Sequence, residues 1–177
     1  MRIYVASSWR NDVQPYYVQM LRAAGHAVYD FRNPPHGRGG FAWADIDPLW
    51  QGWTAKEYRN ALATPVARDG FRSDFDGMQW ADVCVLLLPC GRSAHLEAGF
   101  MAGQGKRVIV MTRDGEEPEL MALLCSEICT SDVELFEALG NPSRGATAPL
   151  PESVGSAVPS PHDIGHGRKR PPPSCNN

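Results

Sequence analysis

Short apolar runs alternate with segments of helical periodicity along the first 139 residues. The apolar runs predict strands over residues 2–6, 26–31, 81–89, 107–112 and 126–130. Apolar residues at helical spacing predict helices over residues 12–24, 54–63, 66–80, 93–103, 118–124 and 132–139. Strands that alternate with helices indicate βαβ units and a parallel sheet. With right-handed crossovers, the pattern predicts an α/β fold with a doubly wound, flavodoxin-like parallel sheet of about five strands.

This pattern stops near residue 140. Residues 140–177 contain no Phe, Tyr or Trp, and they hold eight of the 15 prolines of the chain. Such a segment buries too little apolar area to offset the entropy lost on ordering. We therefore expect one domain over residues 1–139 and a disordered Pro/Ser/Gly-rich tail over residues 140–177. The basic run at residues 168–170 fits a weak interaction motif or, more simply, a solvated chain end.

Composition and charge are those of an ordinary globular protein. Hydrophobic residues make up 43% and charged residues 21%, and the net charge is -3. We expect no nucleic-acid or membrane partner, because a slightly acidic chain has no overall attraction to either. No apolar run approaches the roughly 20 residues that span a bilayer, and the first apolar run is too short for a signal peptide. The five cysteines form no C-x-x-C pair, which favours free thiols and a cytoplasmic location.

Candidate chemistry lies after the strand at residues 81–89, because ligands of open α/β sheets bind beyond the carboxyl ends of strands. The sequence Gly-Arg-Ser-Ala-His-Leu-Glu-Ala-Gly-Phe at residues 91–100 places Glu97 in the first turns of a helix. A single glutamate there is more often a surface residue favoured by the helix dipole. Ser93 either caps this helix or contacts a ligand oxygen.

The end of the first predicted strand offers small and aromatic side chains. Ser7 and Ser8 suit either a helix cap or a ligand contact. Trp9 either stacks on a base or packs on its own loop. The G-x-G-x-x-G pattern is absent, so a dinucleotide site is not supported.

Two further segments carry unusual residue types. Residues 31–53 form a long aromatic-rich loop, which fits a lid or specificity element, a minor core or a subunit interface. The helix at residues 66–80 carries Asp69, Asp74 and Asp76 among apolar neighbours, so at least one carboxylate is expected to be half-buried. His95 and Glu97 diverge on a helix, and no metal-ligand motif is present, so no metal is expected.

Residues 93–100 resemble the glutamate motif of the nucleoside 2-deoxyribosyltransferase family. The sequence Ser-Asp-Phe-Asp-Gly-Met at residues 73–78 is similar to the second motif of that family, and residues 2–6 look like its first strand. The resemblance covers about residues 1–139. It implies cleavage of the N-glycosidic bond of a (deoxy)nucleoside or nucleoside 5′-monophosphate, with transfer of the sugar to another base or to water.

The resemblance also implies roles for particular residues. Glu97 would attack the anomeric carbon and form a covalent glycosyl-enzyme, and Asp74 would bind or help protonate the base. The residues expected to bind substrate are Ser7, Trp9, Arg10, Asp76, Arg92 and Ser93. No cofactor is implied, and a homo-oligomer is expected.

Arg92 departs from the family pattern, since transferases of this family often carry acidic residues just before the glutamate turn. A guanidinium suits a phosphate, so hydrolysis of a nucleoside 5′-monophosphate stands beside base transfer. Two other functions stay open. One is a nucleotide-binding or sensing module without turnover, and the other is an interaction protein that uses the aromatic loop and the tail.

Overall fold

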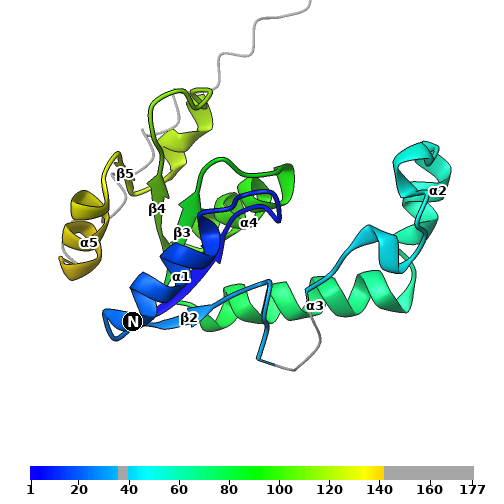
Figure 1. Cartoon of the computed structure of the whole chain (residues 1–177), viewed down its shortest axis with the longest axis horizontal. Coiled ribbons are helices and arrows are strands. Elements are labelled where there is room, and N and C mark those ends of the chain that lie inside the picture. The colour runs from blue at the N-terminus through cyan, green and yellow to red at the C-terminus, as the bar shows by residue number, and fades with distance from the viewer. Residues whose placement is uncertain (36–39, 142–177) are drawn as a thin grey trace, which may run out of the picture.

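The computed structural model describes residues 1–35 and 40–141, and its centre is a five-stranded parallel sheet (Figure 1). The strands are β1 (Arg2–Ala6), β2 (Ala27–Tyr29), β3 (Val83–Leu87), β4 (Arg107–Met111) and β5 (Glu127–Cys129). Their order is β2-β1-β3-β4-β5, and every neighbouring pair is parallel. This order confirms the predicted doubly wound sheet, whose direction of winding reverses between β1 and β3. Of the predicted tail over residues 140–177, Gly140 is the last residue of helix α5 (Asp132–Gly140), and residues 142–177 lie outside the described residues.

The helices follow the predicted bounds to within a few residues. They are α1 (Gln14–Ala23), α2 (Ala55–Ala61), α3 (Pro65–Trp80), α4 (Arg92–Gly103) and α5 (Asp132–Gly140). Three short 3₁₀ turns are η1 (Trp43–Asp45), η2 (Trp50–Gly52) and η3 (Leu120–Leu124). None of the helices within the described residues is long and apolar enough to span a bilayer.

Strand β2 is shorter than predicted because Asp30 turns the chain directly after Tyr29. The carboxylate of Asp30 accepts hydrogen bonds from the backbone N–H of Arg32 at 3.1 Å and from the Asn33 amide at 3.0 Å. Asp and Asn side chains form such turns readily, so the apolar pattern alone overestimates the strand.

Alternate strand residues point to opposite faces of the sheet, and each face has its own core. On one face, Ile3, Val85 and Ile109 pack with residues of α1 and α5. On the other, Tyr4, Cys84 and Val108 pack with residues of α3 and α4. Because the central strands are buried on both faces, their sequences are continuous apolar runs without alternating polar residues.

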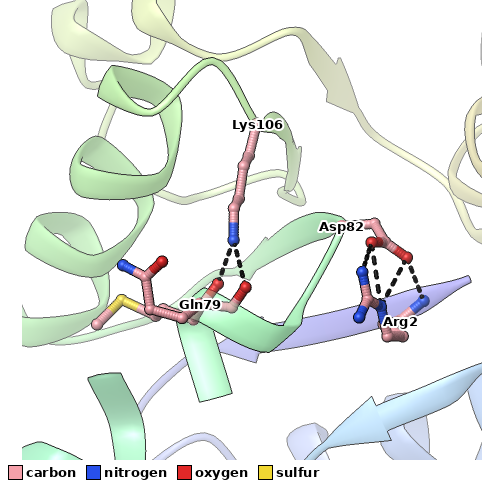
Figure 2. Close-up of polar contacts among 5 residues, drawn as sticks. Arg2, Gln79, Asp82 and Lys106 are labelled. Carbon is pink, nitrogen blue, oxygen red and sulfur yellow. Dashed lines mark hydrogen bonds and ion pairs between the residues drawn. The ribbon is translucent and has the colours of Figure 1, made fainter. Parts of the chain in front are cut away.

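Helix α3 is tied to the sheet at its C-terminal end (Figure 2). The ammonium group of Lys106 donates to the carbonyl oxygens of Met78 at 2.6 Å and Gln79 at 2.9 Å. Beside this contact, Asp82 pairs with the backbone and guanidinium of Arg2. The two bonds from Lys106 satisfy carbonyl groups in the last turn of α3, which have no partner within the helix.

The other end of α3 projects beyond the sheet, together with α2 and the preceding loop (Figure 1). Aromatic rings hold this projection together. Trp43 meets the rings of Phe41, Trp53 and Tyr58 edge-on, at centroid distances between 4.7 and 5.7 Å. None of these four rings is fully buried, so the lid, minor-core and interface roles that the sequence offered for the aromatic loop all stay predictions.

Gly77 allows α3 to approach Tyr29 closely. A Cβ atom at residue 77 would lie 2.7 Å from the Tyr29 ring, a distance that packed atoms do not tolerate. The Tyr29 ring stacks on Tyr4 on the sheet, with centroids 5.2 Å apart and an interplanar angle of 8°. The space is therefore filled on both sides of the Tyr29 side chain.

We expect Gly77→Ala to destabilise the fold by about 1–3 kcal/mol, because the added methyl group overpacks a filled space. Chemical denaturation measures the change. The matched control is Gly103→Ala on α4, where no atom lies within 4 Å of the added Cβ and the free energy of unfolding should not fall. Equal stability of the two variants would contradict the close approach.

Candidate active site

Glu97 and Asp74 bring two largely buried carboxyl groups together beside the switch point of the sheet. Glu97 lies in the second turn of α4, and Asp74 lies in the second half of α3. Burial, with the charge of Asp74 adding to it, raises the pKa of Glu97 to about 7. Burial also raises the pKa of Asp74 to about 6. Near neutral pH the pair is therefore partly protonated, with more of the proton on Glu97 than on Asp74.

Two tyrosines from the sheet face these carboxyls. The Tyr29 hydroxyl donates to Oδ1 of Asp74 at 3.0 Å and lies 2.9 Å from the hydroxyl of Ser73. The Tyr4 hydroxyl is buried and has no partner at full hydrogen-bond geometry within the described residues. It is near enough to Glu97 to oppose part of the rise in the pKa of that carboxyl.

Both tyrosines stay neutral at physiological pH. Burial raises the pKa of Tyr4 and of Tyr29, and the neighbouring carboxylates add to the rise. Tyr29 donates a hydrogen bond to Asp74, and the hydroxyl of Tyr4 lies near Glu97. Sequence reasoning missed both residues, because a tyrosine inside an apolar strand reads as core. The small residue Gly77, in register with Asp74 on α3, is the signal that could have pointed to Tyr29.

Three phenylalanines line up beside the acid pair. Phe71 stacks on Phe75 at a centroid distance of 5.6 Å, and Phe75 meets Phe100 of α4 at 5.5 Å. Phe71 and Phe100 are exposed at the surface. The rings thus join α3 and α4, the two helices that carry Asp74 and Glu97.

The turn after β1 is held rigidly across the sheet. The Ser7 hydroxyl donates to the carbonyl of Leu87 at 2.9 Å, and it accepts from the Asn11 amide at 3.0 Å. The cap residue of α1 is Val13, so neither Ser7 nor Ser8 caps this helix. Ser7 thus joins the ends of β1 and β3, and its role in ligand contact stays a prediction.

Trp9 and Arg10 lie on the surface of this turn. Trp9 is 48% exposed, meets Phe31 edge-on, and has the guanidinium of Arg32 over its ring at 5.3 Å. That guanidinium also donates to the carbonyls of Trp9 and Asn11, at 2.8 and 3.0 Å. The predicted base-stacking surface is therefore partly covered.

Arg92 and Ser93 form the exposed first turn of α4. The cap residue is Gly91, which has no side chain to offer, so Ser93 is not the cap. Asp76 is exposed on α3 and lines a cavity of about 450 Å³ between α3 and β2. The structure thus joins Asp74 with Glu97, whereas Asp76 faces elsewhere.

A larger hollow of about 970 Å³ lies against α4 on the side opposite Glu97. It is lined by residues of α4, of the loop after β4, of η3 and of β5. Within residues 1–35 and 40–141, no three His, Cys, Asp or Glu side chains gather as a metal site would require.

Sheet order and the acid pair define a doubly wound α/β protein with a carboxylate site next to its switch point. One similar solved structure is a 2-deoxyribosyltransferase from Bacillus psychrosaccharolyticus. It is 22% identical, has a TM-score of 0.53, and the match covers 76% of this chain and 90% of that one. This likeness confirms the fold that the sequence resemblance implied.

A second similar structure is a CMP N-glycosidase from Clostridium botulinum, at 13% identity and a TM-score of 0.45. That match covers 80% of this chain and all of the other. Its similarity is too low to support any conclusion about the fold or function of this chain. No protein-family model and no curated protein matches the sequence.

The acid pair should make the fold less stable as pH rises. The folded state holds its protons more tightly than the unfolded chain, so the free energy of unfolding falls between about pH 4.5 and pH 7. Glu97→Gln removes this contribution and should stabilise the protein by about 1–3 kcal/mol at pH 8, with little effect at pH 4. Urea denaturation at both pH values tests this, with Glu137→Gln on the surface of α5 as the control. A Glu97→Gln protein no more stable than the wild type at pH 8 would contradict the buried charge.

Proposed function

We propose that this protein cleaves the N-glycosidic bond of a (deoxy)nucleoside or nucleoside 5′-monophosphate through a covalent glycosyl-glutamate intermediate. The observation that carries the proposal is the half-buried pair of Glu97 and Asp74, whose pKa values are both raised toward neutral, so that the reactive form, with Glu97 ionised and the proton on Asp74, is accessible near pH 7. Retaining glycosidases use two carboxyls in this way, one as nucleophile and one as acid. The fold shared with a 2-deoxyribosyltransferase supports the same chemistry.

In the first step, a carboxylate oxygen of Glu97 forms a bond to the anomeric carbon while the bond from that carbon to the base nitrogen breaks. The base leaves with the electron pair, and Asp74 supplies the proton that neutralises it. In the second step, water or the nitrogen of another base attacks the anomeric carbon. The bond to Glu97 breaks, and Asp74 takes up the proton that the attacking group loses.

Further substrate contacts are proposed for residues at the carboxyl ends of β1 and β3 and on α3. Trp9 offers an aromatic edge to the base, and Ser7 and Asp76 remain candidates for polar contacts. Arg92 and Ser93 lie at the first turn of α4, where free backbone N–H groups and a guanidinium favour a 5′-phosphate. Arg10, on the turn after β1, would add a second positive charge.

The decisive measurement follows release of free base from a panel of nucleosides and monophosphates by chromatography, with and without an acceptor base. We expect Glu97→Ala to lower the rate at least about 10³-fold, because it removes the nucleophile. Mass spectrometry of the wild type with a 2-fluoro sugar substrate should show an adduct on Glu97. Full activity of Glu97→Ala would overturn the proposal, whereas ligand binding without base release would favour the nucleotide-sensing alternative.

We also propose that the expected homo-oligomer forms through the large hollow beside α4. The connection from β4 to β5 contains only the five-residue turn η3, which is too short to cover the sheet. Large apolar side chains are consequently exposed around the hollow, among them Leu96 at 75%, Met121 at 59% and Ile128 at 52%. Monomeric proteins seldom expose a continuous apolar patch of this kind.

Charge favours a second copy of the same chain on this surface. Arg92 lies at the α4 side of the hollow, and the loop at the other side is acidic on balance, with Asp114, Glu116 and Glu117 against Arg113. A two-fold axis through the hollow brings the basic side of one copy to the acidic side of the other.

Met121→Asp should therefore convert the wild-type oligomer into monomers. Sedimentation velocity on the full chain measures the state, with Leu49→Asp as a control. Leu49 is 78% exposed but lies outside the hollow, so its substitution should leave the oligomer intact. A monomeric wild type, or an oligomer that persists in Met121→Asp, would overturn this interface.

A further inference from the structure

The hydroxyl of Tyr29 lies between two side chains of α3 and contacts both. It donates to Oδ1 of Asp74 at 3.0 Å and lies 2.9 Å from Oγ of Ser73. A phenol has only one proton. When that proton goes to Asp74, the Ser73 hydroxyl must donate to Tyr29, because Tyr29 has only lone pairs left to offer.

The position of this hydroxyl is fixed by packing on both sides of the ring. Tyr4 stacks against one face of Tyr29, and Gly77 lies so close that no larger residue fits there. Tyr29 is itself buried. The hydroxyl therefore cannot follow Asp74 if the carboxyl turns, and the carboxyl is oriented by the hydroxyl.

We propose that Tyr29 is a positioning residue for Asp74, whose hydrogen bond to Oδ1 leaves Oδ2 as the oxygen that carries the transferable proton. With Asp74 ionised, Oδ1 can only accept from Tyr29. With Asp74 protonated on Oδ2, the same hydrogen bond persists and neither hydroxyl has to rotate. Ser73 supports this arrangement by donating to Tyr29. The inference rests on the proposed function, since it assigns the acid role to Asp74.

The other groups that face Asp74 are consistent with this role. Glu97 approaches from α4, and a negative charge on either carboxyl disfavours a charge on the other. Tyr4 faces Glu97 from β1. The bond from Tyr29 favours the ionised form of Asp74 and so keeps its pKa lower than burial alone would.

The first test requires no substrate. Carbon-13 NMR follows the carboxyl titration of Asp74 in the wild type, in Tyr29→Phe and in Ser73→Ala. Loss of a hydrogen bond to a charged group should raise the midpoint in Tyr29→Phe by about 1 pH unit. Ser73→Ala should raise it less. Tyr16→Phe, at a half-exposed tyrosine of α1, is the matched control and should leave the midpoint unchanged.

The second test separates proton delivery from general damage to the fold. Tyr29→Phe should lower kcat for a nucleoside about 10-fold with little change in KM. A nitrophenyl glycoside of the same sugar needs no proton on its leaving group, so its kcat should fall much less. Equal losses on both substrates, or an unchanged Asp74 midpoint in Tyr29→Phe, would overturn the role of Tyr29. The two proposals can fail separately. If Tyr29→Phe shifts the Asp74 midpoint but the wild type releases no base, the coupling of Tyr29 to Asp74 is supported and the proposed function is overturned.

Discussion

The close approach of α3 to the sheet at Gly77 is the constraint on which the candidate site depends. It lets the Tyr29 ring lie between the helix and Tyr4, and it brings Asp74 within hydrogen-bond distance of a residue on β2. A side chain at residue 77 would separate these layers. Because Gly77 has no Cβ atom, the carboxyl of Asp74 on α3 can reach the hydroxyl of Tyr29 on β2.

Burial of two acids conflicts with stability, and the surrounding contacts moderate the conflict. Each carboxyl loses water when it enters the space between α3 and α4, which raises both pKa values. Hydroxyl groups from the sheet replace part of that water. Catalytic sites commonly accept a loss of folding stability to hold acids with altered pKa values. A pair of this kind is therefore more typical of a catalytic site than of a purely structural contact.

Much of the architecture could be predicted from sequence, because apolar runs and helical periodicity report burial directly. The five strands and their parallel pairing follow from that signal, and Glu97 follows from its place after β3. Tyr29 could not be found in this way, because its hydroxyl acts across the gap between two distant segments. The short strand β2 and the 3₁₀ turn η3 were also missed in part, since Asp30 and a short connection act through local geometry that periodicity does not show.

Because Lys106 holds only the C-terminal end of α3, a tilt of this helix displaces its residues in proportion to their distance from that end. At 1.5 Å per residue, Asp74 lies about 6 Å from the anchored carbonyl of Met78, and Pro65 lies about 20 Å from it. A tilt that displaces the projecting end by about 3 Å would move Asp74 by only about 1 Å. Motion of the aromatic projection therefore changes the distance between the two carboxyls very little, because Asp74 lies close to the fixed end of α3.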